Sequence, residues 1–279
     1  MFDTVESLNH SLIQHGQLNK RIYLMDLDKR DHPQIFSLLD KLAEKKDYSK
    51  IFAKIPKWAV DEAKKNEYEV EAKIPGFFND KIDGYFLGKF LDHSRSQIDE
   101  TTAEKIKKVH LSFQKYKKNL PERKNTNETN VRRLFDHDAE KLAKLYASVF
   151  ETYPFPIYKT DYLKKMMKQH VHYYGVLEND ELVSASAAEM NPSYSNVEMT
   201  DFATLPEKRG NNYALSLLHH MEYEMKKEKM KTAFTIARAI SFGMNITFAK
   251  ADYTFAGLLK NNTAIAGSLE SMNVLFKKI

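Results

Sequence analysis

The stretch LPEKRGNNYA at residues 205–214 joins a predicted strand to a predicted amphipathic helix. The residues that precede it, 197–205, include Val, Met, Thr, Phe and Leu, as a buried strand does. The residues that follow it place apolar side chains at the spacing of one helix face: Ala214, Leu217, Leu218, Met221 and Met225. The turn therefore opens a helix directly after a buried strand, which is typical of an α/β protein.

This turn is suited to binding a diphosphate. The start of a helix leaves backbone amides without intrahelical partners and carries a partial positive charge. Lys208 and Arg209 add positive charge, and Gly210 lets the backbone approach a ligand closely. The same residues also fit an ordinary strand-to-helix turn with solvated basic side chains, so the pattern by itself leaves both interpretations open.

Composition limits the class of protein. The chain has 279 residues, enough for one large domain or two modest ones, and a net charge of +5 spread among interleaved Lys, Glu and Asp. Nucleic-acid binding is therefore not indicated. No run approaches the ~20 apolar residues of a membrane span, and no signal sequence is visible, so we expect a cytoplasmic protein without a membrane partner. The absence of cysteine excludes disulfides, thiolate metal sites and a cysteine acyl-enzyme.

A polar, proline-containing stretch at 119–129 is expected to link two domains. The N-terminal domain, 1–118, is predicted to be a small α/β unit with strands at 21–27, 48–55, 68–73 and 84–91 and helices at 34–45 and 57–66. The C-terminal domain, 130–279, is predicted to contain in order a strand at 131–135, helices at 139–150 and 161–169, a hairpin of 172–177 and 182–190, the strand, turn and helix described above, a strand at 232–237 and a helix at 242–251.

This order resembles that of the GNAT N-acetyltransferases. Residues 209–214 are similar to GNAT motif A, with Asn212 in place of a glycine, and Asn tolerates a positive φ better than other non-glycine residues. Four further segments resemble the β-lysine N-acetyltransferases in particular: MTDFAT at 199–204, TIARA at 235–239, GMN at 243–245 and ESMN at 270–273. The resemblance covers nearly the whole chain and implies an α/β (α+β) protein with a GNAT fold in its C-terminal half.

The resemblance implies direct acetyl transfer from acetyl-CoA to the ε-amine of β-lysine, without a metal. In that family the product, Nε-acetyl-β-lysine, is a compatible solute in osmoadaptation. The residues implied in binding CoA are Ala203, Leu205, Arg209, Gly210, Asn211, Asn212, Tyr213 and Ala214. Two alternatives stay open, namely a GNAT acting on a polyamine or a protein lysine, and a non-catalytic acyl-CoA-binding regulatory module. A homodimer and a degenerate GNAT-like N-terminal half also stay open.

The reaction requires a neutral amine, and an intrinsic pKa near 10.4 makes a general base useful. Glu198 and Asp201 on the predicted central strand are the candidate bases. Because their spacing is odd, we expect them to face opposite sides of the sheet, and we favour Asp201 because it lies closer to the CoA end. A backbone amide near Ala203 is expected to stabilise the thioester oxygen.

The general acid has no assignment. In the alignment to the GNAT pattern, Ser241 stands at the position of an Asn and Phe248 at that of the usual tyrosine, so the family-typical proton donor is missing. Tyr253, Tyr213 or water could replace it. The adjacent histidines at 219–220 lack a third residue at metal-ligand spacing, so no metal is expected.

A β-lysine acceptor offers a carboxylate and a second amine at its far end. Chemical matching suggests Arg238 for the carboxylate, Glu270 for the second amine, and Asn261 and Asn262 as neutral partners. A structural Arg238–Glu270 pair explains the same residues equally well. The segment YPFP at 153–156 is expected either to cover the acceptor cleft or simply to end a helix.

Overall fold

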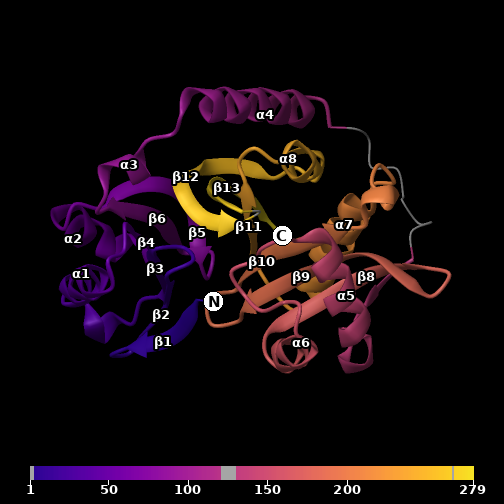
Figure 1. The fold of residues 1–279 in the computed structure, drawn as a ribbon, viewed down its shortest axis with the longest axis horizontal. Coiled ribbons are helices and arrows are strands. Elements are labelled where there is room, and N and C mark those ends of the chain that lie inside the picture. Colours follow the sequence, from indigo (N-terminus) through magenta and orange to yellow (C-terminus); the bar gives the residue numbers. More distant parts are fainter. Residues whose placement is uncertain (1–2, 121–129, 266) are drawn as a thin grey trace.

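A single mixed sheet of 13 strands, with helices packed on it, forms the framework of the molecule (Figure 1). The computed structural model describes residues 3–120, 130–265 and 267–279, so most of the predicted linker lies outside the described residues. The strand order is β1-β2-β3-β4-β6-β5-β12-β13-β11-β10-β9-β8-β7. The N-terminal and C-terminal halves of the chain therefore occupy the two sides of one continuous sheet.

The N-terminal half contains all four predicted strands and both predicted helices. Its elements are β1 (Thr4–Leu8), β2 (Ser11–Gly16), β3 (Arg21–Asp26), η1 (Lys29–Asp31), α1 (Ile35–Lys46), β4 (Lys50–Pro56), η2 (Lys57–Ala59), α2 (Val60–Lys65), β5 (Glu69–Phe78), β6 (Ile82–Phe90), α3 (His93–Ser96) and α4 (Glu100–Lys118). The predicted strands are β3, β4, β5 and β6, and the predicted helices are α1 and η2 with α2. The elements β1, β2, α3 and α4 have no counterpart among the predictions.

The C-terminal half has the predicted order of elements. They are β7 (Val131–Arg133), η3 (Asp136–Asp138), α5 (Ala139–Val149), α6 (Thr160–Met167), β8 (Val171–Glu178), β9 (Glu181–Asn191), β10 (Asn196–Thr204), η4 (Pro206–Lys208), α7 (Tyr213–Lys227), β11 (Thr232–Arg238), α8 (Phe242–Lys250), β12 (Thr254–Ile265) and β13 (Ser268–Lys278). The predicted hairpin is confirmed, and Asn179 and Asp180 both adopt positive φ, as its two-residue turn requires. The strands β12 and β13 have no predicted counterpart.

The two halves share one pattern of strands. Within the N-terminal half, the order β1-β2-β3-β4-β6-β5 repeats the C-terminal order β8-β9-β10-β11-β13-β12. In each half, one parallel pair is joined through a helix: β3 and β4 through α1, and β10 and β11 through α7. In each half, a terminal hairpin then places its second strand beside that pair. The two halves thus have the same connectivity over six strands.

The halves meet where β12 pairs with β5. Gly257 of β12 lies opposite Ala72, and its backbone passes very close to Glu71. The Glu71 carboxylate accepts hydrogen bonds from the buried ammonium of Lys50 (2.8 Å) and from the Lys260 amide (2.6 Å). The sheet is therefore continuous across the boundary through backbone pairing and through the hydrogen bonds that Glu71 and Lys50 form with the backbone of Lys260.

Helix α4 forms a second connection between the halves. Figure 1 shows it lying across the top of the molecule, from the N-terminal side to α8. At its end, the Lys117 ammonium donates to the carboxylate of Asp252 (2.9 Å) and to the carbonyl of Tyr253 (2.8 Å), just before β12 begins. The last helix before the predicted linker therefore rests on the C-terminal half.

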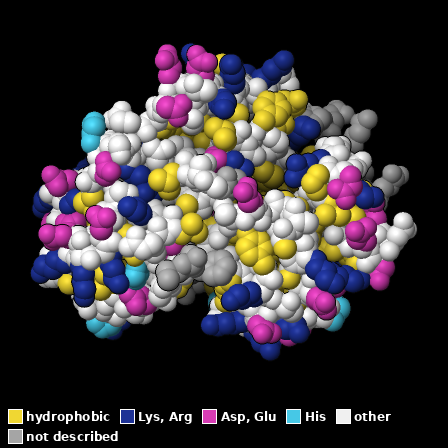
Figure 2. Space-filling view, in the orientation of Figure 1, with side chains coloured by type: hydrophobic (Ala, Val, Ile, Leu, Met, Phe, Trp, Pro, Cys, Tyr) yellow, Lys and Arg dark blue, Asp and Glu magenta, His cyan; other side chains and the backbone are white. Residues whose placement is uncertain are grey.

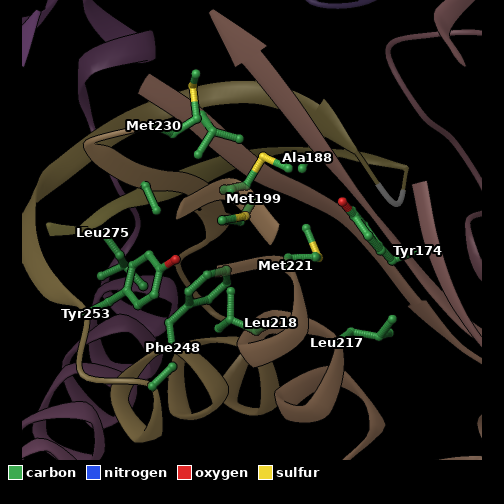
Figure 3. Packing of buried hydrophobic residues seen from close by; sticks show 14 of the residues in the cluster. Tyr174, Ala188, Met199, Leu217, Leu218, Met221, Met230, Phe248, Tyr253 and Leu275 are labelled. Atoms are coloured by element: carbon green, nitrogen blue, oxygen red, sulfur yellow. The ribbon is translucent and has the colours of Figure 1, made fainter. Parts of the chain in front are cut away.

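The largest hydrophobic cluster lies between the C-terminal sheet and helices α7 and α8 (Figure 3). The face predicted for the helix after 205–214 is confirmed, because Leu217, Leu218, Met221 and Met225 are fully buried. Met199 of β10 packs into the same cluster and is also fully buried. This packing fixes the start of α7 against the end of β10, at the turn singled out in the sequence.

The surface carries both signs of charge. On the face shown in Figure 2, Lys and Arg side chains lie among Asp and Glu side chains. Within the described residues, no helix combines the length and apolar character that crossing a membrane requires.

Candidate active site

A cavity of about 370 Å³ opens where β10 and β11 separate. These parallel strands pair only over Asn196–Glu198 and Thr232–Phe234. The residues of these two strands that line the cavity lie mostly at and beyond the point where the pairing ends. From these two strands, the lining includes Glu198, Thr200, Asp201, Phe202, Thr235, Ile236, Ala237 and Arg238. From the N-terminal half, it includes Leu12, Gln14, Arg21, Tyr23, Met25, Asp26, Phe52 and Lys54. The volume is typical of a small-molecule site, and both halves build it.

A bulge in β10 corrects the predicted directions of the two candidate bases. The register with β9 shifts between Thr200 and Ala203, and Asp201 has φ of 55°. The extra residue breaks the alternation of side chains along the strand. Consequently Glu198 and Asp201 both line the cavity, and the expectation that they face opposite sides is wrong.

A third carboxyl, Glu189 of β9, joins them at the cavity wall. Desolvation by the cavity wall, reinforced by the other two carboxyls, raises the pKa of Glu189. Burial raises the pKa of Glu198 to about 7, although the nearby Lys54 opposes the shift, and it raises the pKa of Asp201 to about 6. The cluster therefore retains protons at neutral pH, and Asp201 is the member that ionises first.

Tyr153 touches this cluster directly. Its hydroxyl donates a hydrogen bond to Asp201, and it lies with Pro154 and Phe155 in the cavity wall, as one of the two interpretations of the segment 153–156 expects. The bond favours the ionised form of Asp201 and so lowers its pKa against the effect of burial. Tyr153 is thus positioned to tune this carboxyl.

Tyr153→Phe is expected to move the acidic limb of the pH profile of kcat/KM upward by about one to two pH units, because a hydrogen bond to a charged group contributes about 1.5–3 kcal/mol. The reason is that the Asp201 pKa rises once its donor is gone. Tyr158→Phe is the matched control, since Tyr158 does not line the cavity. An acidic limb that stays in place in Tyr153→Phe would contradict the assigned contact.

The tyrosines proposed as acids lie elsewhere. The Tyr213 hydroxyl donates to Glu178 beside the turn, and Tyr253 is fully buried behind Phe248. Of the described tyrosines, Tyr23 and Tyr153 line the cavity. Ser241 and Phe248, the two positions taken from the GNAT alignment, line it as well.

The turn at 205–214 presents free amides. Among the described residues, no internal hydrogen bond is formed by the amides of 210–214, whereas the Leu205 amide donates to Val183 (3.0 Å). Asn212 adopts φ of 57°, as expected for a residue that replaces glycine there, and Gly210 has φ of 90°. These amides lie at the start of the 15-residue helix α7, so the turn fits a diphosphate.

The two basic side chains of the turn differ in their surroundings. The Lys208 ammonium binds the Glu178 carboxylate at 2.5 Å. Arg209 is exposed and forms no ion pair with any described residue. Ala203 follows the bulge at the base of the turn and is buried. Arg209 is therefore the cation of the turn that is available to a phosphate, beside the exposed Asn211 and the half-buried Tyr213 and Ala214.

The four residues that chemical matching suggests for the far end of the acceptor differ in their contacts and in whether they line the cavity. The Arg238 guanidinium binds the Glu270 carboxylate at 2.6 Å; Arg238 lines the cavity and Glu270 does not. The Asn261 side chain donates to the carbonyls of Arg95 and Gln97 in the N-terminal half and lies outside the lining. Asn262 is buried and lines the cavity.

Sequence reasoning did not single out Glu189 or the N-terminal residues of the cavity. Their common signal is a polar side chain within an otherwise apolar strand, as in RIYLMD at 21–26 and KIFAKIP at 50–56. Burial would lower the pKa of Lys54, but Tyr23 and Glu198 outweigh it and raise that pKa, so Lys54 is a cation at neutral pH. No cluster of His, Asp and Glu suited to a metal occurs in the part of the chain that the structure describes.

A splayed parallel pair, a bulged strand and a helix that opens with free amides define the class of GNAT acetyltransferases. Consistent with this geometry, the family described as acetyltransferase (GNAT) domain matches residues 130–248. The chain is 37% identical to the β-lysine N(6)-acetyltransferase of Methanococcus maripaludis, over 99% of this chain and 98% of that protein. It is 31% identical to the N-acetyltransferase YodP of Bacillus subtilis over 96% of each chain. It is 32% identical to the β-lysine N(6)-acetyltransferase of Methanosarcina mazei over 61% of this chain and 63% of that protein. The chain belongs to the β-lysine N-acetyltransferase family.

Proposed function

We propose that this enzyme transfers the acetyl group of acetyl-CoA to the ε-amine of β-lysine and so forms Nε-acetyl-β-lysine, a compatible solute in osmoadaptation. The observation that carries the proposal is the presence of both acidic and basic side chains in the cavity beside the CoA turn. Four acidic and three basic side chains line it. β-Lysine carries two ammonium groups and one carboxylate, so the wall offers partners to groups of both signs. The names of two relatives support the same acceptor.

Asp201 is the proposed general base. Keeping a lysine-type amine neutral at pH 7 costs about 4–5 kcal/mol in water. Asp201 has the lowest pKa of the three cavity carboxyls and receives the Tyr153 hydrogen bond, so it is the one that is ionised and oriented. Glu198 and Glu189 border the same space and offer further carboxyl oxygens to the ammonium groups.

In the proposal, the acetyl group passes directly from the thioester to the amine, and the absence of cysteine excludes a cysteine acyl-enzyme. In the proposal, the bulge next to Ala203 presents a backbone amide to the developing negative charge on the thioester oxygen. The amides at 210–214 and Arg209 hold the phosphates. The amine loses its proton to Asp201, and the thiolate of CoA leaves.

The N-terminal half is proposed to be a degenerate GNAT-like half that serves the acceptor only. Its strand order repeats that of the catalytic half, and its parallel pair also faces the cavity. The segment that leads from its β3 to its α1, LDKRDHPQ at 27–34, contains no glycine and therefore lacks the feature that brings the backbone close to a phosphate.

The test of the acceptor measures CoA-thiol release with acetyl-CoA and, separately, β-lysine, α-lysine, spermidine and a lysine-containing peptide. The chain adds no thiol background. A strong preference for β-lysine supports the proposal. Preference for another amine replaces the acceptor and keeps the reaction class. Binding of CoA without turnover on any amine indicates the non-catalytic module instead.

Arg209→Ala is expected to raise the KM for acetyl-CoA by about 10-fold or more and to leave the KM for the amine nearly unchanged, because a charge-assisted phosphate contact contributes about 1.5–3 kcal/mol. Lys208→Ala is the matched control: its ammonium is already bound by Glu178, so we expect a smaller change. Steady-state kinetics with each substrate varied in turn measures both. Equal increases in the two KM values would remove Arg209 from the phosphate site.

A further inference from the structure

Arg21 is a buried guanidinium that forms no direct ion pair in the described residues, although the carboxylates of Asp3 and Glu71 lie near enough to favour its charge. It is 4% exposed, begins β3 and lines the cavity. Its Nη1 donates to the Asn262 carbonyl (2.5 Å) and to Thr263 Oγ1 (3.1 Å), both neutral groups. Its Nε is buried and unbonded. Burial lowers the pKa of Arg21 to about 10, so the group is still charged at neutral pH.

A buried charge without a direct counter-ion is costly, and the cost falls when an anionic ligand reaches it. The ring centres of Tyr23 and Phe52 lie 5.6 and 5.7 Å from the guanidinium carbon, within cation–π range. Neither ring can neutralise the charge. Arg21 is therefore suited to bind a carboxylate that enters the cavity.

Two further buried polar atoms near the same end lack partners. Gln14 is 2% exposed and its Nε2 donates to nothing in the structure, and Asn262 is 1% exposed and its Oδ1 accepts nothing. Both residues line the cavity, and Asn262 is tied to Arg21 through its own carbonyl. Buried polar groups are ordinarily hydrogen-bonded, so two free donors and one free acceptor at one cavity wall point to a ligand that supplies the opposite groups.

We propose that this wall binds the β-amino acid end of the acceptor, which is its carboxylate and the neighbouring ammonium group. The Arg21 guanidinium and the Gln14 side-chain amide, which both line the cavity, donate to the carboxylate, and the Asn262 side chain accepts from the neighbouring ammonium as these side chains adjust to the ligand. In β-lysine these two groups are separated by a single methylene, so one wall can hold both while the longer arm carries the ε-amine toward Asp201. The proposal rests on the proposed function and deepens it.

In this arrangement, Gln14 of β2 and Arg21 of β3 recognise the acceptor together with Asn262 of β12, whereas the turn at 205–214 binds CoA. Arg238 differs from Arg21 because Glu270 already neutralises it at 2.6 Å. An arginine paired with a glutamate gains less from a ligand carboxylate than an unpaired one. Arg21, rather than Arg238, is therefore assigned as the main carboxylate-binding residue.

The experiment compares two acceptors, β-lysine and 1,4-diaminopentane, which is the same molecule without its carboxylate. Arg21→Met is expected to raise the KM for β-lysine by about 10- to 100-fold and to affect 1,4-diaminopentane and the KM for acetyl-CoA far less. Arg21→Lys keeps the charge but not the paired donors of the guanidinium. Its KM for β-lysine is expected to lie between those of the unaltered enzyme and of Arg21→Met. Gln14→Leu should show the same selectivity with a smaller loss, of about 5- to 10-fold.

Equal losses on the two acceptors in Arg21→Met, or a selective loss in Arg238→Met and not in Arg21→Met, would overturn the assignment. If Arg21→Met does not fold, the ratio of the two acceptors in Gln14→Leu decides. Turnover of β-lysine by the unaltered enzyme tests the proposed function separately. If no amine is turned over, binding of 3-aminobutanoate, measured by NMR on the unaltered protein and on Gln14→Leu, still tests the wall: weaker binding to the variant supports it, and equal or absent binding overturns it.

Discussion

Asp201→Asn is expected to lower kcat/KM at pH 7 by about 10²- to 10⁴-fold, the contribution typical of a positioned general base. The substitution preserves the shape of the side chain, and Asn tolerates the positive φ of 55° at this position, so the bulge should persist. The carboxylate alone is removed. Steady-state rates between pH 5.5 and 10 measure the effect.

The pH dependence follows from the direction of the shift. Burial raises the pKa of Asp201 to about 6, so the unaltered enzyme gains its base as pH rises through that value and loses it below. In Asp201→Asn this limb disappears. The rate instead rises as the pH approaches the amine pKa near 10.4, because the substrate then loses its proton without a base. Part of the loss is therefore recovered at high pH.

Asp180→Asn is the matched control, since Asp180 also has positive φ but is exposed at the β8–β9 turn, where the residue can be replaced without touching the cavity. A loss in Asp201→Asn that is the same at every pH would remove Asp201 as the base. Glu198→Gln, measured in the same way, would then be the next variant, because Glu198 faces the same cavity.

Gly257→Ala is expected to destabilise the protein by about 3 kcal/mol or more, at the upper end of single substitutions. An added Cβ would lie 2.6 Å from the Ala72 Cα and closer still to the Glu71 carbonyl oxygen. Both are backbone atoms of the paired strand, so no side chain can turn aside. Thermal unfolding should show a fall in Tm of about 6–12 °C for a chain of this size.

Gly243→Ala provides the comparison. A Cβ there meets nothing within 4 Å, and Gly243 lies in helix α8, where alanine is the better helix former. We expect its Tm to stay the same or to rise slightly. If Gly257→Ala had the same Tm as the unaltered protein, the close approach of β12 to β5 would be wrong.

The order of elements in the C-terminal half could be predicted from sequence, because each element there has a clear local signal. The helix after 205–214 buries one apolar face, and the hairpin has Asn179 and Asp180 at its turn. The strand β1 is almost wholly exposed, so it lacks a hydrophobic pattern. The strand β12 contains Gly257 and a polar run at 260–263, so it also lacks a hydrophobic pattern and has no predicted counterpart.

The geometry of the site was less accessible, for two physical causes. The alternation of side chains along a regular strand predicted that Asp201 and Glu198 face opposite sides. That prediction failed because a bulge adds a residue, and the bulge has no clear sequence pattern. Arg21, Gln14 and Lys54 reach the cavity only because distant strands share one sheet. Local periodicity indicates that such residues lie in strands, but not which distant residues face them, as Asn262 faces Arg21 across 241 positions.

The place of β12 and β13 in the sheet has a consequence for how the enzyme is made. These two strands follow all the others along the chain, yet they lie between β5 and β11, at the seam of the sheet. While the polypeptide leaves the ribosome, each half can gather its own earlier strands, but the seam stays open until residues 254–278 emerge. Contacts between segments so far apart in sequence form slowly. The cavity wall that carries Asn262 is thus assembled late, and a nascent chain contains the N-terminal half and most of the C-terminal half before it can form a complete site.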